Sequence, residues 1–286
     1  MNAVILDGKK IAGDLNEEIK KEITLLSQRH SPKLAAIQIG SDPASEAYVR
    51  SQQRRAQDVG IDYRLEEFNY DVIEDELAEV IDGLNKDKEV TGIIIQRPVP
   101  KGIDIQRLIY LINPQKDTEG VHPENMGRLF SSSYIVAPPT SLAVMKLLEE
   151  TGAELYGKDA VIIGHSDIAG KPLSILLLNE FATTSVCHIA TSERGRIPEY
   201  IKRAEVLISA AGVPGLVKGS WIKEGAIVVD VGINKVGENI VGDVEFETAK
   251  TKASYITPVP GGVGPVTTAM LMKNCLQLFK IQSAKQ

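Results

Sequence analysis

The stretch 161-VIIGHSDIAGKP-172 joins an apolar run to a helical pattern through a turn that is bounded by two glycines. In that context a glycine removes the Cβ that would block a pyrophosphate, and the helix N-terminus supplies free N–H groups and a favourable dipole. Five residues separate Gly164 from Gly170, which departs from the G-x-G-x-x-G pattern of dinucleotide sites. The stretch predicts a strand, a turn and a helix, and a tight turn without a nucleotide is the alternative.

Apolar runs rich in β-forming residues alternate with helical periodicity on both sides of this turn, which is the pattern of parallel α/β units. In the first half we expect helices at 11–29, 43–59 and 74–85 and strands at 34–39, 63–68 and 92–96. Segment 112–125 is rich in turn residues and predicts a loop. In the second half we expect helices at 141–150, from 171 and through 280, and strands at 160–163, 185–188, 206–209 and 227–231. The second half is therefore Rossmann-like.

Length and charge limit the class of protein. A chain of 286 residues is long enough for two domains, each with its own core. A net charge of -6 argues against nucleic acid as a partner, because neutralising phosphates requires clustered Lys and Arg. The start lacks the pattern of a signal peptide, and no apolar run is long enough to span a membrane, so we expect a cytoplasmic protein. Cys187 and Cys275 lie far apart in apolar segments, which predicts buried free thiols and no metal site.

Polar residues follow the predicted strands and helices at several points. Gln96 opens 96-QRPVP-100 at the end of a strand, where open α/β sheets place ligands, although a strand-ending turn is the simpler interpretation. The loop 116-KDTEG-120 offers two carboxylates that suit an amino-pyrimidine edge or are merely solvated. Tyr48 and Gln52 are four residues apart and share one face of a predicted helix. The loop 260-PGGVGP-265 allows the backbone to approach a planar ligand, or is purely structural.

Taken in order, these motifs resemble one known family. AYV, Q-x-P-x-P, KDTEG with HPEN-MGRL, GHSDIAGKP, 229-VDVGIN-234, 242-GDV-244 and TPVPGGVGPVT follow the order of the methylenetetrahydrofolate dehydrogenase/cyclohydrolase family over roughly residues 3 to 280. The resemblance implies two α/β domains with a folate site in the cleft between them. It assigns residues 1–140 and 266–286 to a folate-binding catalytic domain and residues 141–265 to a Rossmann-like NAD(P)-binding domain. It also implies a homodimer.

The resemblance further implies which residues form the site. It assigns catalysis to Tyr48, Gln52, Gln96 and Glu119. It assigns substrate binding to Tyr48, Gln96, Pro98, Asp117, Glu119, Pro260, Gly261 and Gly262. It assigns cofactor binding to Gly164, His165, Ser166, Ile168, Ile189, Ala211, Gly212, Val231, Gly232, Ile233, Gly262 and Thr267. Tetrahydrofolate is the implied one-carbon carrier, and NAD or NADP is the implied cofactor.

The sequence departs from the family pattern at three places. Gln52 stands where the family has Lys, and an amide cannot exchange a proton, so we expect dehydrogenase activity with weak or absent cyclohydrolase activity. Glu119 stands where the family usually has Asp, which keeps the carboxylate and moves it by one methylene. Ser141 and Ala143 replace the usual Pro and Gly, a change that we interpret as tolerable.

The nucleotide preference depends on two further positions. NADP-using members often carry Arg at position 165 and a polar or basic side chain near 189, where the chain has His165 and Ile189. An apolar side chain cannot pair with a phosphate, and neutral His is a poorer partner than Arg. NAD is therefore favoured over NADP. Two other functions stay open: a fully bifunctional enzyme in which another group or ordered water replaces the Lys, and a non-catalytic folate- or nucleotide-binding paralogue.

Overall fold

The computed structural model describes residues 2–26, 30–40 and 43–284. The chain divides into two compact units. The Rossmann-like unit comprises Met1–Gly13 and Pro138–Thr267, and the N-terminal unit comprises Asp14–Ala137 and Thr268–Gln286. The predicted α/β class and the Rossmann-like second half are confirmed. The sequence places residues 1–13 with the first half, but they belong to the Rossmann-like unit because β1 (Val4–Ile5) pairs with β11 (Tyr255–Ile256).

The N-terminal unit is built on a parallel sheet in the order β3-β2-β4. Its strands are β2 (Lys33–Ile39), β3 (Asp62–Phe68) and β4 (Gly92–Ile95). β2 and β4 are buried along almost their whole length, as their runs of Ala, Ile and Leu require. Its helices are α1 (Gly8–Leu26), α2 (Pro43–Val59), α3 (Glu74–Lys86), α4 (Ile105–Leu111), α5 (Pro123–Phe130) and α11 (Val263–Ser283), and the division between the units falls within α1 and α11.

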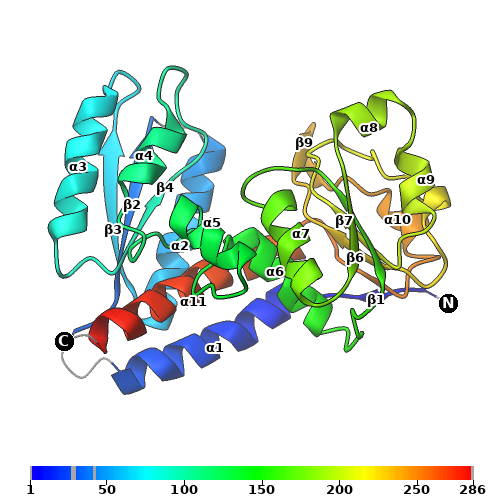
Figure 1. Ribbon diagram of the computed structural model, residues 1–286, viewed down its shortest axis with the longest axis horizontal. Helices are drawn as coiled ribbons and strands as arrows, with labels where there is room; N and C mark the ends of the chain where they lie inside the picture. The colour runs from blue at the N-terminus through cyan, green and yellow to red at the C-terminus, as the bar shows by residue number, and fades with distance from the viewer. Residues whose placement is uncertain (1, 27–29, 41–42, 285–286) are drawn as a thin grey trace. The chain divides into compact units, whose positions relative to one another are not determined.

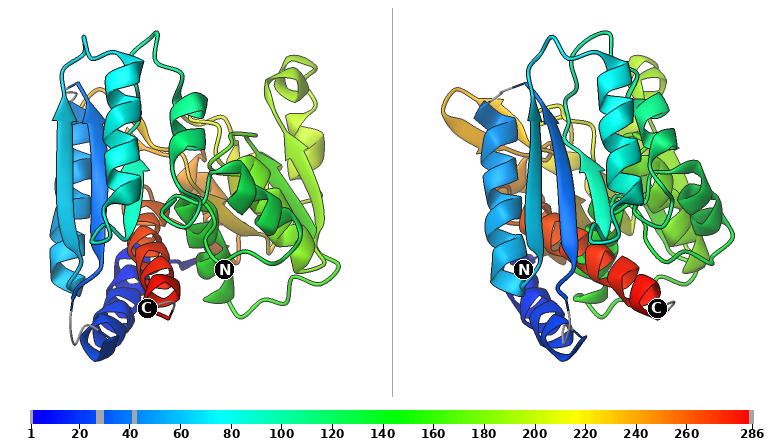
Figure 2. Two further views of the ribbon diagram at one scale, coloured as in Figure 1. Left: turned by 60° about the vertical axis from the view of Figure 1, so that its left-hand side comes forward. Right: turned by 90° about the vertical axis from the view of Figure 1, so that its left-hand side faces the viewer.

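Alternate residues of β2 enter two separate cores, as the two-residue period of a strand dictates. Leu34 and Ala36 face α2 and α11, where they pack with apolar residues of both helices. Ala35 and Ile37 face the other way, toward α3 and α4. Figure 2 shows α2 on one side of this sheet and α3 on the other. The carboxyl ends of β2, β3 and β4 therefore emerge at one edge of a sheet that is covered on both faces.

The Rossmann-like unit holds a fully parallel sheet in the order β1-β11-β8-β7-β5-β6 (Figure 1). Its further strands are β5 (Asp159–Ile163), β6 (Thr183–Cys187), β7 (Val206–Ser209) and β8 (Ile227–Asp230). The short strands β9 (Asn234–Val236) and β10 (Asn239–Val241) form an antiparallel hairpin after β8. Strand β5 lies between β7 and β6, so the chain reverses its direction across the sheet after β6. Open α/β sheets bind ligands at such a switch point.

Helices cover both faces of this sheet. Figure 1 shows α6 (Pro139–Glu149) and α7 (Gly170–Asn179) on one side, and α9 (Ile197–Ile201) and α10 (Phe246–Ala249) on the other. The core on the second side joins Val161 and Val228 of the strands to Ile201 of α9 and Ala249 of α10. The unit also contains α8 (Ile189–Glu193) and the single 3₁₀ turn η1 (Gly219–Trp221).

The predicted elements are present, with shifts of one to three residues at most ends. The helix predicted at 11–29 is α1, Gly8–Leu26, and the rest of that prediction falls on residues 27–29, outside the described part of the chain. The prediction of a loop at 112–125 is wrong at its end, because α5 begins at Pro123. His122 caps it, since Nδ1 accepts the N–H of Glu124 at 3.1 Å. Helix α4, which the sequence did not indicate, starts after Asp104, whose Oδ1 accepts the N–H of Gln106 at 2.9 Å.

Within the described residues, no helix has the length and apolar character needed to cross a membrane. The same part of the chain contains no group of three or more His, Cys, Asp or Glu side chains that could hold a metal ion. Cys187 and Cys275 are both buried free thiols. Burial raises the pKa of Cys275 to about 12, so this thiol stays protonated and unreactive.

Candidate active site and dinucleotide site

Four side chains of the N-terminal unit form one hydrogen-bonded cluster. Gln96 follows β4 directly, Gln52 projects from α2, and Tyr63 is the second residue of β3. Gln96 Nε2 donates to Gln52 Oε1 at 2.8 Å, and the Tyr63 hydroxyl donates to the same oxygen at 2.9 Å. Gln52 is 2% exposed and Gln96 is 6% exposed. Tyr48, one turn before Gln52 on α2, is hydrogen-bonded to Gln52 and also to Thr268 of α11.

This amide–phenol cluster, Tyr48, Gln52, Tyr63 and Gln96, has few protons to exchange near neutral pH. The two amides do not titrate. Burial of the hydroxyl raises the pKa of Tyr48, although two-fifths of its side chain is exposed, and burial also raises the pKa of Tyr63. The cluster is therefore a neutral, ordered surface of hydrogen-bonding groups, which suits it to orienting a bound molecule.

Glu119 lies beside this cluster because the segment that carries it extends the sheet. The N–H of Ile93 donates to the carbonyl of Lys116 at 2.7 Å, and the N–H of Thr118 donates back to Ile93 at 3.3 Å. Ile93 therefore pairs with Asp117 as in a parallel strand, and two residues further on Ile95 donates its N–H to the Glu119 carboxylate. Gly120 ends the segment in the left-handed conformation, where a Cβ would come within 2.7 Å of Ala137.

The environment of Glu119 shifts its protonation to neutral pH. Loss of water around the half-buried carboxyl group raises its pKa, and the neighbouring Asp117 raises it further. The Arg97 guanidinium and the N–H of Ile95 act in the opposite direction. Desolvation dominates, and the pKa of Glu119 rises from 4.5 to about 7.

Asp117, which was predicted to bind the substrate, is buried beneath the loop that carries Glu119. It is 1% exposed, and its Oδ2 accepts the N–H of His122 and the Nδ2 of Asn125, both at 2.8 Å. The Asn274 amide of α11 supports the same segment through the carbonyl of Thr118 at 2.9 Å. The structure therefore shows Asp117 holding the loop that presents Glu119, and a contact between Asp117 and a substrate stays a prediction. Asn125 and Asn274 were not indicated by the sequence, and Asn274 lies 156 residues from its partner Thr118.

The glycine turn of the Rossmann-like unit is as tight as the sequence predicts. Gly164 follows β5 with φ +119°, and a Cβ there would lie 2.3 Å from the carbonyl oxygen of Ala210. A Cβ on Gly170 would lie 2.1 Å from the carbonyl oxygen of Gly164. The turn between them exposes His165 and Ser166, and no side chain caps the N-terminus of α7. An uncapped helix N-terminus beside a glycine turn fits the pyrophosphate of a dinucleotide.

A buried carboxylate that the sequence did not single out organises the loop after β7. Asp243 is fully buried, and its Oδ2 accepts Ser209 Oγ at 3.1 Å and the N–H groups of Ala211 at 2.8 Å and Gly212 at 3.2 Å. Its Oδ1 accepts the N–H of Val213 and the Nδ2 of Asn234, both at 2.9 Å. Ala211 and Gly212 were predicted to bind the cofactor, but their N–H groups donate to Asp243.

Asp230 at the end of β8 forms the second half of this buried pair. It accepts the N–H groups of Gly232 at 3.0 Å, Asp243 at 3.1 Å and Val244 at 2.9 Å. Burial and the nearby Asp243 carboxylate raise the pKa of Asp230 to about 6, although these N–H groups oppose the shift. A Cβ on Gly232 would collide with Asp243 at 2.1 Å, so the glycine predicted for cofactor binding is required by the carboxylate pair itself.

The other predicted cofactor residues lie at the same edge of the sheet. Ile189 follows β6 and is 69% exposed, and Ile233 follows β8 and is 67% exposed. The rings of His165 and His188 lie 5.3 Å apart at the ends of β5 and β6. The remaining predicted positions in the Rossmann-like unit are Ile168, Val231, Thr267, Pro260, Gly261 and Gly262. Their contacts with a ligand stay predictions, as does the contact of the exposed Pro98 in the N-terminal unit.

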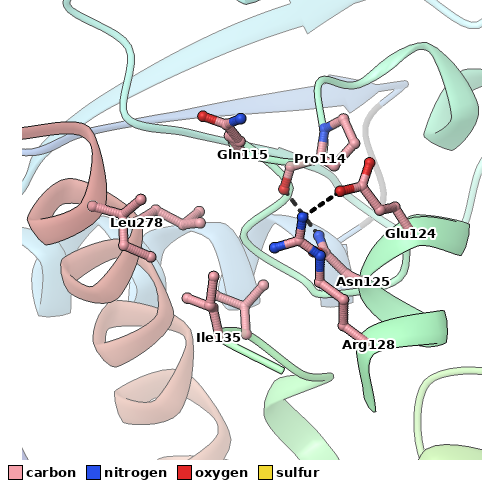
Figure 3. Close-up of a pocket in the computed structure, with 9 residues that line it drawn as sticks. Pro114, Gln115, Glu124, Asn125, Arg128, Ile135 and Leu278 are labelled. Atoms are coloured by element: carbon pink, nitrogen blue, oxygen red, sulfur yellow. Dashed lines mark hydrogen bonds and ion pairs between the residues drawn. The ribbon is translucent and has the colours of Figure 1, made fainter. Parts of the chain in front are cut away.

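A small cavity in the N-terminal unit lies away from the amide–phenol cluster. It has a volume of about 100 Å³ between α5 and α11, and its walls include Ile135, Val136, Leu278 and Ile281. Figure 3 shows Arg128 at its side reaching toward Glu124, with which it forms an ion pair of 2.5 Å. Ligand pockets measure about 300–1,000 Å³, so this cavity is too small for a folate or a dinucleotide.

A larger hollow of about 490 Å³ lies against Asp230 in the Rossmann-like unit. Its lining includes Glu245 and Glu247 besides Asp230. Three carboxyl groups repel the phosphates of a dinucleotide, so we assign the hollow no role in cofactor binding.

The Rossmann-like sheet with its glycine turn, and the separate sheet that carries the amide–phenol cluster and Glu119, define the class of a dinucleotide-dependent two-domain α/β enzyme. Residues 6–119 match the catalytic domain of tetrahydrofolate dehydrogenase/cyclohydrolase, and residues 138–283 match the NAD(P)-binding domain of the same family. The chain belongs to the tetrahydrofolate dehydrogenase/cyclohydrolase family, as its motifs indicated, and its cofactor class is NAD(P).

Individual relatives agree along their whole length. The bifunctional protein FolD of Nitratiruptor sp. is 46% identical over 278 residues, which cover 96% of this chain and 98% of the relative. The bifunctional FolD structure from Campylobacter jejuni is 42% identical, with a TM-score of 0.94 over 98% of this chain and 99% of that one. The Trypanosoma brucei FolD structure, complexed with NADP and an inhibitor, is 39% identical, with a TM-score of 0.95 over 100% of both chains.

Proposed function

We propose that this protein oxidises 5,10-methylenetetrahydrofolate with NAD(P) and also hydrolyses the methenyl product. The observation that carries the proposal is the hydrogen-bonded cluster of Tyr48, Gln52, Tyr63 and Gln96, in which both amides are buried and Gln96 lies at the carboxyl end of β4. The relatives named bifunctional FolD support both activities. In this proposal the N-terminal unit binds the folate, and the Rossmann-like unit binds the dinucleotide.

Hydride transfer requires the protein's side chains to orient the reactants but not to transfer a proton. A nicotinamide held in the Rossmann-like unit would supply the hydride acceptor, and the flanking nitrogens of the folate would stabilise the cation that remains. The protein contributes orientation, which supplies roughly 7–11 kcal/mol in well-aligned systems. Gln52 Oε1 takes hydrogen bonds from Tyr63 and Gln96 at once, so neither amide rotates freely. The cluster therefore holds the Gln96 amide and the Tyr48 hydroxyl in fixed directions for a bound folate.

Hydrolysis makes a different demand, because adding water to the methenyl cation requires proton transfer. Gln52 cannot supply it, and this observation favours a second candidate function: a dehydrogenase without cyclohydrolase activity. The bifunctional proposal is preferred because several relatives between 44% and 48% identical carry the bifunctional name. It requires that another group in the N-terminal unit exchange the proton.

For the nucleotide, we propose a preference for NAD over NADP. Ile189 is exposed at the start of α8, directly beyond the end of β6, where a Rossmann sheet meets the adenosine ribose. An apolar side chain there offers no partner to a 2′-phosphate. The rings of His165 and His188 lie 5.3 Å apart at the neighbouring strand ends, and an imidazole is a poorer partner for a phosphate than a guanidinium.

The assembly and location of the protein are also proposals. The family resemblance supports a homodimer in the cytoplasm, and the net charge of -6 supports small-molecule partners over nucleic acid. Light scattering during gel filtration tests the dimer, since it measures the mass in solution against the 31.1 kDa of one chain.

A spectrophotometric assay of both reactions with both nucleotides tests the proposed function. Methylenetetrahydrofolate should reduce NAD, and methenyltetrahydrofolate should decay faster with the enzyme than in a non-catalytic buffer. Reduction of NAD without enzyme-dependent decay would establish the second candidate, the dehydrogenase alone. No change in NAD(P)H absorbance together with no enzyme-dependent decay would leave only a non-catalytic binding protein.

A further inference from the structure

Among the described residues, Glu119 is the group beside the amide–phenol cluster that can exchange a proton near neutral pH, because the neighbouring Asp117 carboxyl group already accepts the N–H of His122 and the amide of Asn125. The Gln52 and Gln96 amides do not titrate, and burial makes the Tyr48 and Tyr63 hydroxyls weaker acids than usual. A guanidinium such as that of Arg97 is not a proton-exchanging group in proteins. Glu119 is the remaining side chain, and it combines a carboxyl group with partial burial.

The position of Glu119 connects it to both ends of the cluster. Because segment 116–118 pairs with β4, Glu119 lies opposite Ile95, and Gln96 is the next residue on that strand. From α2, the Tyr48 hydroxyl is close enough for the Glu119 charge to raise its pKa. Glu119 is therefore next to the groups that orient the folate in the proposed function.

The charges that face Glu119 come from three places. Arg97 approaches from the exit of β4, Asp117 from its own segment, and Tyr48 from α2. Arg97 favours the carboxylate, whereas burial and Asp117 favour the neutral acid, and the balance brings the pKa to about 7. A group that is half protonated at the working pH both accepts and returns a proton efficiently.

We propose that Glu119 is the acid–base residue of the hydrolysis, in place of the lysine that Gln52 replaces. The inference rests on the proposed function. The oxygen of water bonds to the methenyl carbon while the Glu119 carboxylate takes one of its protons. The bond from that carbon to one flanking nitrogen then breaks, the nitrogen takes the proton from Glu119, and the remaining hydroxyl proton passes to solvent as the formyl group forms. The cation, one water and one released proton balance, and Glu119 is regenerated.

This role differs from that of a carboxylate that only binds the pterin edge. A binding carboxylate must stay ionised, and its loss raises the KM of both reactions equally. An acid–base residue controls the kcat of hydrolysis and gives it a pH dependence. The two roles therefore separate in a comparison of the two reactions.

The test uses Glu119→Gln, Glu119→Asp and the control Glu79→Gln, which removes the same charge from an exposed position on α3. In wild type, kcat for hydrolysis should rise with pH and level off above about 7. In Glu119→Gln it should fall about 10²–10⁴-fold and lose this rise, with a much smaller loss in the dehydrogenase reaction. Glu119→Asp should retain the rise, and Glu79→Gln should match wild type.

Each other outcome overturns the inference in a recognisable way. If Glu119→Gln keeps the pH rise, or loses both reactions equally with a higher KM, the residue binds the folate and does not carry the proton. If wild type itself does not hydrolyse the methenyl compound, the bifunctional proposal fails and the inference fails with it. Carboxyl ¹³C NMR of glutamate-labelled protein adds a readout without turnover: a resonance titrating near 7 should vanish in Glu119→Gln and not in Glu79→Gln.

Discussion

Replacing Asp243 by Asn should lower the free energy of unfolding of the Rossmann-like unit, although the two side chains have nearly the same shape. The carboxylate accepts five hydrogen bonds, three on Oδ2 and two on Oδ1. Asn has one oxygen, and its NH₂ group would face donors on whichever side it takes. If the NH₂ group takes the Oδ1 position, which has fewer donors, it would still face the N–H of Val213 and the Nδ2 of Asn234.

The magnitude follows from those two donors. Each buried donor left without an acceptor costs about 1–3 kcal/mol, so Asp243→Asn should lower the stability by about 2–6 kcal/mol. The three remaining bonds also lose their charge assistance, which makes this a lower bound. Typical domains are stable by about 5–15 kcal/mol, so the loss is a large fraction of the total.

Trp221 provides the assay. It is the one tryptophan in the sequence, and it packs against the core of the Rossmann-like unit. Its fluorescence in a urea titration therefore reports the unfolding of that unit, and the midpoint should fall by about 1 M or more at a slope of about 1–3 kcal/mol per M. Glu224→Gln removes an exposed charge in the same unit and is the control. A midpoint for Asp243→Asn equal to that of the control would refute the reasoning.

Three further outcomes are expected. Wild type should show a lower KM for NAD than for NADP, and Ile189→Arg should improve kcat/KM for NADP; equal or better efficiency with NADP in wild type would contradict the first part. Gln52→Lys should raise the rate of hydrolysis in the Glu119→Gln background by about 10-fold or more, because the site regains a titratable group. An unchanged rate of methenyl decay in the double variant would contradict this expectation. The pKa of Asp230 is about 6 in the folded state, against an ordinary value of 3.8, so the folded state binds more protons between these values. The contribution of Asp230 to the free energy of unfolding should therefore fall by roughly 1–3 kcal/mol as pH rises from 4 to above 6. Urea titrations across this pH range should show a flatter dependence for Asp230→Asn than for wild type.

The long, periodic elements could be predicted from the sequence, because their signals are local. The strands at 160–163 and 206–209 are largely apolar runs, each preceded by an acidic residue, and they match β5 and β7 within one residue. The helix at 43–59 has the bounds of α2. Helices α4 and α5 were missed because seven or eight residues are too few to establish a period, although Asp104 and Pro123 are ordinary helix-start signals.

The candidate site was predictable only in part. Tyr48 and Gln52 share a helix face, and the structure brings Gln52 to Gln96 as the motifs suggested. Tyr63 was missed because a tyrosine at the start of a strand carries no special signal, and its partner Gln52 lies on another element. The Asp230–Asp243 pair was missed for the same reason, because donors such as the N–H groups of Ala211 and Asp243 come close to these carboxylates only in the folded chain. The local indication of the pair was the two glycines: a Cβ on Gly232 would collide with Asp243, and a Cβ on Gly242 would collide with Asp230.

The pairing of β1 with β11 has a consequence for biosynthesis. Val4 pairs with Tyr255, so β1 cannot pair until β11 has been synthesised about 250 residues later. At about 5–20 residues per second, that interval is roughly 10–50 s. Both β1 residues are largely exposed even when paired. During synthesis β8 is therefore an open edge until residue 256 has emerged, and a nascent chain stalled before that point exposes unpaired backbone groups to neighbouring chains.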